Sequence, residues 1–95
     1  MYNYRDFTYD HINFKDLPDF VNELHAESIR YAVILDAGIA QRPSGTYPAF
    51  DLGVEQNVFI KIRDDELFTG KVWPKDSVYV DWFSTNASHW WESEL

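Results

Sequence analysis

An aspartate that directly follows an apolar run is the first residue whose position suggests chemistry. The run YAVIL at residues 31–35 is continuous, has the length of a strand, and ends at Asp36. Such a run is typical of a parallel strand that is buried on both faces. Because active sites of β/α folds lie at the carboxyl ends of parallel strands, Asp36 is a candidate ligand-binding carboxylate.

Ile34 is the second candidate at this strand end. Side chains alternate along a strand, so Ile34 is expected on the same side as Asp36, beneath it or beside a bound ligand. The alternative is structural: Asp36 accepts backbone hydrogen bonds and caps the loop that follows. The pattern alone leaves both interpretations open.

Trp73 is the third candidate, in the tetrapeptide KVWP at residues 71–74. The proline restricts the turn after it, so the indole is expected at the end of a short strand. Sugars present apolar C–H faces beside hydroxyl groups, and their pockets combine an aromatic wall with carboxylates that accept hydrogen bonds. Trp73 and Asp36 together suit such a pocket, although a tryptophan buried under a long loop is an equally good interpretation.

Other kinds of site find little support. The three histidines, His11, His25 and His89, are scattered without metal-ligand spacing, and no phosphate-binding loop, serine elbow or cysteine occurs. We therefore expect no metal and no cofactor. Asn86 begins the triplet Asn-Ala-Ser, an N-glycosylation acceptor pattern that has meaning only in the secretory pathway.

The elements that must position these residues begin with a helix. Asp16 is a candidate N-cap, Pro18 lies in the first turn, and Asp19 suits the positive end of the helix dipole. The apolar stripe predicts an amphipathic helix that ends near residue 28 and packs on another element; its members are Leu17, Phe20, Val21 and Leu24.

The rest of the chain predicts a loop, a hairpin and a second helix. Residues 37–57 have no steady period and are expected to form a long loop, and strands at 58–62 and 68–73 are expected to flank a polar turn. A final helix is predicted to start after Ser84 or Thr85, and Trp82, Trp90 and Trp91 are expected to belong to its core. The predicted fold class is α/β: about one and a half βα units of a (β/α)8 TIM barrel, with a long loop and a β-hairpin excursion.

Composition bounds the class of protein. The 95 residues are 45% apolar and 18% aromatic, so the chain is globular and holds at most one small domain. A net charge of −8 argues against nucleic acid as a partner. No stretch approaches the roughly 20 apolar residues that cross a bilayer. A buried parallel strand needs neighbouring strands, so we expect the isolated chain to be marginally stable or to associate.

Six segments, read in order, resemble one family. They are RDFTYD at residues 5–10, FKDLP at 14–18, AVILDAGI at 32–39, YPAFDLG at 47–53, GKVWP at 70–74 and VYVD at 78–81. The family is glycoside hydrolase family 31, and the resemblance is closest to its animal α-glucosidases. It extends over residues 1–95, which we interpret as a fragment of a catalytic barrel rather than a complete domain.

The resemblance implies a function. Members hydrolyse terminal α-linked glucose from oligosaccharides with retention, through an aspartate nucleophile and a second aspartate as acid/base. Both aspartates belong to family motifs expected beyond Leu95, so no catalytic residue is assigned here and the isolated chain is expected to be inactive. Met1 corresponds to the last residue of the Asp-x-Asp-Tyr-Met motif. Asp36, Ile34 and Trp73 correspond to residues that line the glucose subsite.

Three departures from the family pattern and two alternative functions remain. One is Val80-Asp81-Trp82, where the family pattern has Pro-Asp-Phe. Asp-Pro-Ala after the strand is Asp36-Ala37-Gly38 here, which is expected to loosen the adjacent loop, and a family cysteine is replaced by Ala87. The chain could instead be a non-catalytic carbohydrate-binding or interaction module built on Trp73 and Asp36, or an acidic structural domain without a ligand. A location in the lysosome, at the cell surface or outside the cell follows from the family alone.

Overall fold

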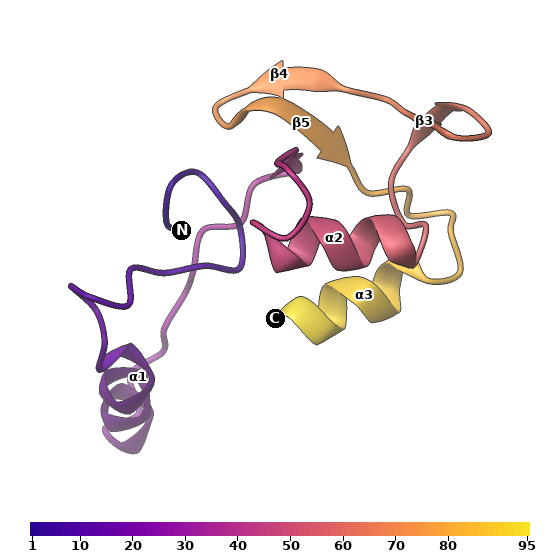
Figure 1. Cartoon of the computed structure of the whole chain (residues 1–95). Coiled ribbons are helices and arrows are strands. Elements are labelled where there is room, and N and C mark those ends of the chain that lie inside the picture. Colours follow the sequence, from indigo (N-terminus) through magenta and orange to yellow (C-terminus); the bar gives the residue numbers. More distant parts are fainter.

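The computed structural model describes all residues, 1–95, and contains three helices and five short strands. In chain order they are α1 (Leu17–Ala26), β1 (Gly38–Ala40), α2 (Pro48–Glu55), β2 (Lys61–Arg63), β3 (Glu66–Leu67), β4 (Gly70–Val72), β5 (Lys75–Tyr79) and α3 (Ala87–Glu94). Figure 1 shows α2 and α3 side by side, the β4–β5 hairpin beyond α2, and α1 standing apart from the other elements. None of the helices has the length and apolar character needed to cross a membrane.

Helix α1 confirms the first predicted helix but not its capping or its packing. Proline lies in its first turn, as predicted, whereas the Asp16 side chain makes no capping hydrogen bond. No residue of α1 is buried, and Phe20 in the apolar stripe is exposed. The helix ends where Ser28 adopts a left-handed conformation, with φ of 61°. The stripe is therefore only partly covered: Leu17, Val21 and Leu24 are half-buried, and Phe20 is exposed.

The prediction of a buried strand at residues 31–35 is wrong for this structure. The segment is extended, but none of the backbone groups of residues 30–35 forms a hydrogen bond with another backbone group. Val33 and Ile34 are 60% and 76% exposed. A strand is stabilised by backbone hydrogen bonds to a neighbouring strand. No segment among residues 1–95 forms such bonds with residues 30–35.

The predicted long loop at residues 37–57 is also wrong, because it contains β1 and α2. Pro48 occupies the first turn of α2 with Tyr47 as the N-cap residue in an extended conformation. Proline suits this position because its φ angle is already helical and its missing N–H would have no partner there. Both elements are short and lie among Gly, Pro and Ser residues, so their hydrophobic patterns could not be recognised in the sequence.

The three-stranded sheet is antiparallel. Its strand order is β1-β5-β4, with Ile39 opposite Val78 and Lys71 opposite Asp76. The predicted polar turn at residues 63–66 is present between β2 and β3, which form a separate two-stranded sheet. The predicted strand at 68–73 is shorter, and β4 leads through a tight turn at Trp73 and Pro74 into β5.

The core lies between α2, α3, the strands β1 and β5, and residues 58–59, which follow α2. Trp90 of α3 is fully buried, as predicted, and its ring contacts Phe59 edge to face at 5.4 Å between centroids. Its indole N–H donates to the Ala49 carbonyl at 3.2 Å. Trp82 does not belong to this core, because its side chain is exposed. The buried apolar cluster comprises Ile39, Ala40, Tyr47, Ala49, Phe50, Val58, Phe59, Val78, Val80, Ala87 and Trp90.

Candidate functional site

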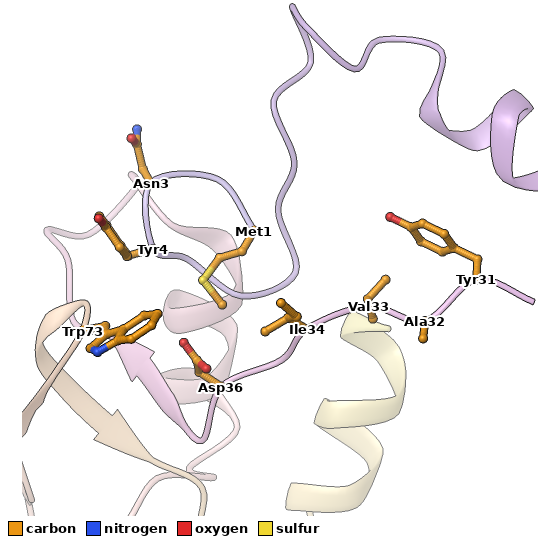
Figure 2. Close-up of a pocket in the computed structure, with 9 residues that line it drawn as sticks. All are labelled: Met1, Asn3, Tyr4, Tyr31, Ala32, Val33, Ile34, Asp36 and Trp73. Carbon is orange, nitrogen blue, oxygen red and sulfur yellow. The ribbon is translucent and has the colours of Figure 1, made fainter.

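A hollow of about 590 Å³ lies where three segments of the chain meet. The N-terminal turn, the extended segment at residues 31–36 and the β4–β5 turn form its walls (Figure 2). All three side chains predicted from sequence, Ile34, Asp36 and Trp73, line this hollow. Met1, Asn3, Tyr4, Tyr31, Ala32 and Val33 complete the lining.

Trp73 is presented by the tight turn between β4 and β5. Val72 pairs with Lys75 across this turn, and Lys75 adopts a left-handed φ of 73° that reverses the chain. Pro74 is buried, whereas the Trp73 indole is 82% exposed. The alternative of a tryptophan buried in the core is therefore wrong, and the ring offers an open apolar face.

Asp36 stands at the end of the extended segment and faces the same space. Figure 2 shows its carboxylate beside the Trp73 indole, with the Met1 side chain above them. No hydrogen bond of the structure ends on the Asp36 carboxylate, so it does not cap the following loop. It is the one carboxylate that lines the hollow. The arrangement can accept hydrogen bonds from hydroxyl groups, whereas retaining glycoside hydrolysis needs two carboxyl groups across the scissile bond.

A smaller hollow of about 240 Å³ adjoins the first and shares Asp36 and Trp73 with it. Gly38 lies in its wall at the start of β1. A Cβ on this glycine would meet Val72 Cγ2 at 2.6 Å. The expectation that Gly38 loosens a loop is therefore wrong, because Gly38 is buried in a sheet pairing and allows β4 to approach closely.

Asp6 is the polar residue at this site that the sequence prediction missed. Its side chain is 1% exposed, and its Oδ1 accepts the Asp36 backbone N–H at 3.1 Å. Its Oδ2 has no hydrogen-bond partner. Burial raises the pKa of the Asp6 carboxyl, the bond from the Asp36 N–H opposes this rise, and the nearby Asp36 charge adds to it.

Tyr47 connects Asp6 to α2. Its hydroxyl donates to the Asp6 backbone carbonyl at 2.9 Å, and the phenol is buried. Burial, with the Asp6 charge, raises the pKa of Tyr47, so the hydroxyl stays protonated as a donor. The Arg5 guanidinium lies 5.8 Å from the centre of the same ring. Asp6 is thus attached to both the pocket wall and the core.

The predicted glycosylation residue, Asn86, does not line this hollow. It is exposed at the N-terminus of α3, and its side-chain N–H donates to the Gln56 carbonyl at 3.0 Å. Its modification stays a prediction. No group of three or more His, Cys, Asp or Glu side chains is arranged to hold a metal ion.

Comparison with known proteins gives the family. The model of the glycosyl hydrolases family 31 TIM-barrel domain matches residues 1–95. Intestinal sucrase-isomaltase of Oryctolagus cuniculus is 43% identical over 94 residues, covering 95% of this chain and 5% of that protein. Lysosomal alpha-glucosidase of Mus musculus is 37% identical over 89 residues, covering 93% of this chain and 9% of that protein.

Solved structures agree with these relatives. The crystal structure of the glucosidase II alpha subunit in its DNJ-bound form superposes with a TM-score of 0.80 at 29% identity, and covers 95% of this chain and 10% of that chain. The chain thus spans a tenth or less of the length of each of these three proteins. Mixed helices and strands, six ordered sequence segments and the family match agree, and the chain belongs to glycosyl hydrolase family 31.

Proposed function

We propose that this chain forms part of the glucose-binding pocket of an α-glucosidase barrel that releases terminal α-linked glucose from oligosaccharides. The observation that carries the proposal is that Ile34, Asp36 and Trp73 line one hollow. Ile34 and Trp73 are 39 residues apart in the sequence (73 minus 34). An exposed indole face and a free carboxylate supply the two kinds of contact that a pyranose ring needs.

The extended segment at residues 31–35 becomes a barrel strand in this proposal. Its backbone groups are free of other backbone partners, and its side chains are apolar on both sides. A strand of a parallel barrel is buried on both faces and pairs along both edges. The segment therefore carries the sequence of a central strand and lacks only its neighbours.

The catalytic carboxylates come from outside these residues in this proposal. Asp36 is the one carboxylate lining the hollow, and Asp6 is buried beneath it with its Oδ1 already occupied. The proposed role of this chain is to bind and orient glucose. The relatives named lysosomal and intestinal support a place in the secretory pathway, where Asn86 could carry a glycan.

A chimaeric enzyme tests the proposal. This chain would replace the matched segment of Mus musculus lysosomal alpha-glucosidase, and kcat/KM would be measured on maltose and a chromogenic α-glucoside. We expect the chimaera to be active, and Asp36→Asn or Trp73→Ala to lower kcat/KM by about tenfold or more, since each removes a contact to the bound sugar. Trp82→Ala is the matched control, because Trp82 is exposed but does not line the hollow.

The outcomes separate clearly. An inactive chimaera, or an active one that Asp36→Asn and Trp73→Ala leave unchanged, contradicts the proposal. An equal loss in Trp82→Ala would mean that the assay reports damage to the fold rather than to the pocket.

A second function, sugar binding without catalysis, is favoured by one observation: Trp73 and Asp36 form a hollow within the 95 residues themselves. Calorimetric titration of the isolated chain with a glucose-mimicking iminosugar tests this. Binding that Trp73→Ala abolishes, together with no release of glucose from maltose, would favour the binding module.

A further inference from the structure

Asp6 links the two opposite walls of the hollow. The N-terminal turn supplies Met1 and Tyr4 to one wall, and the segment at residues 31–36 supplies the other. No backbone–backbone hydrogen bond joins residues 1–10 to residues 30–37. The Asp6 side chain bridges them by accepting the Asp36 N–H at 3.1 Å, across 30 residues of sequence.

Asp6 is itself held by the core. Its carbonyl accepts the buried Tyr47 hydroxyl at 2.9 Å. The next residue, Phe7, packs edge to face against Trp90 and Trp91 of α3, with ring centroids 5.9 and 5.0 Å apart. The acceptor for the Asp36 N–H therefore has a fixed place relative to the folded part of the chain.

The segment that Asp6 holds has little other support. Residues 30–35 make no backbone–backbone hydrogen bonds, and the pairing of β1 with β5 begins only at Gly38. The backbone direction at Asp36 sets where its carboxylate lies, so the bond to Asp6 fixes the side chain that faces the hollow.

Stability alone does not explain a carboxylate at this position. Burying a charged group is costly unless it is paired, and the Asp6 Oδ2 has no partner. An apolar side chain could fill a buried position without this cost, but it could not accept the Asp36 N–H. The acceptor is the property that a substitution would lose.

We propose that Asp6 is a positioning residue of the glucose pocket: it holds the Asp36 backbone and thereby orients the Asp36 carboxylate toward the sugar. The inference rests on the proposed function, because it needs Asp36 to contact the ligand. Asp6 acts through Asp36 and does not touch the sugar.

A double-mutant cycle in the chimaera described above tests the inference. We expect Asp6→Ala to lower kcat/KM on maltose by about tenfold, and Asp6→Asn to stay within about twofold of wild type, since the amide oxygen accepts the same N–H. In an Asp36→Ala background, Asp6→Ala is expected to have almost no further effect. The melting temperature of each variant shows whether a loss of activity comes from unfolding or from a misoriented Asp36 carboxylate.

Each outcome has one meaning. Additive losses from Asp6→Ala and Asp36→Ala, or an Asp6→Asn as impaired as Asp6→Ala, overturn the inference and leave the proposed function standing. If Asp36→Ala is as active as wild type, the proposed function fails, and the inference with it. In NMR spectra of the 95-residue chain, an Asp36 amide signal that Asp6→Ala leaves unmoved would also overturn the inference.

Discussion

Asp6 and Asp36 are two carboxylates that the fold uses in different ways. Asp36 offers its oxygens to the hollow, whereas Asp6 is buried and accepts a backbone N–H from Asp36 itself. Burial raises the pKa of Asp6 above the 3.8 of a free aspartate. The folded state therefore binds the Asp6 proton more tightly than the unfolded state does, and ionisation of Asp6 weakens folding.

This shift predicts a pH-dependent stability difference. Wild type should lose stability relative to Asp6→Asn as pH rises from about 3.8 through the raised pKa, because only wild type must bury a charge. Urea unfolding of both proteins between pH 3 and pH 7 gives the free energy of unfolding of each at every pH, and so the difference between them. A difference that stays constant across this range would contradict the prediction.

Asp10 is the control of opposite sign. Its carboxylate accepts hydrogen bonds from the Ile12 and Asn13 backbone N–H groups and the Asn13 side chain, which lower its pKa. Its contribution is present above the unfolded pKa and is lost as pH falls through the lower folded value. The stability advantage of wild type over Asp10→Ala should thus shrink toward acid pH.

Trp90 and Trp73 are expected to contribute very differently to stability. Trp90 is fully buried and hydrogen-bonded to Ala49, and Trp73 is 82% exposed. Trp90→Ala is expected to lower the free energy of unfolding by about 3–5 kcal/mol, and Trp73→Ala to change it by only about 0.5 kcal/mol or less. Denaturant unfolding followed by circular dichroism checks both. Similar costs for the two substitutions would mean that Trp73 belongs to the core.

The three pocket residues could be predicted from sequence, but Asp6 could not. Asp36 ends an apolar run and Trp73 precedes a proline, and both are local signals. The Asp6 hydrogen bond joins residues that are 30 positions apart, and no local pattern marks such a pair. The resemblance placed Asp6 inside a matching segment without saying what it contacts.

At the scale of elements, α2 packs closely on the chain that follows it. Gly53 in α2 is buried, and a Cβ there would overlap the Phe59 ring. Phe59 stacks on Phe50 and meets Trp90 edge to face, so the ring has little freedom to move away.

Gly53→Ala is therefore expected to destabilise the chain. Alanine usually stabilises a helix relative to glycine by about 1 kcal/mol, but overpacking here should cost about 1–3 kcal/mol and exceed that gain. Thermal or urea unfolding measures the net change. Val54→Ala, at an exposed position of the same helix, is the control and should be near neutral. A more stable Gly53→Ala would show that Phe59 can shift.

Elements with strong local signals were predictable, and those that depend on distant partners were not. The proline near Asp16 and the apolar stripe predicted α1, and the last helix was also predicted correctly as α3. Residues 31–35 have the composition of a strand, yet strand formation depends on neighbours that local pattern does not reveal. Helix α2 was missed because it has only eight residues and contains a glycine.

The whole molecule is elongated, with principal extents of 49 × 27 × 22 Å, and carries much apolar side-chain surface outside its core. Val33 and Ile34 are largely exposed, and Phe20 of α1 lies open as well. Exposed apolar side chains next to unpaired backbone groups favour association with another strand. That the isolated chain is marginally stable or associates stays a prediction, and these side chains are where we expect association to occur.

Val33→Lys is expected to reduce self-association of the isolated chain, because it places a charge in the unpaired segment. Sedimentation equilibrium over a range of concentrations measures the effect. Ser44→Lys, at an exposed polar position, adds the same charge elsewhere and is the control. If both variants reduce association equally, net charge rather than the segment is responsible.

The residues that line the hollow contribute little to the stability of the fold. Ile34 and Trp73 are 76% and 82% exposed, while the buried cluster that stabilises the chain lies elsewhere. In the proposed function, substitutions at the wall would therefore alter sugar recognition while leaving the buried cluster intact. Under that proposal these positions can vary independently of the core, so barrels that share one architecture can diverge in substrate choice.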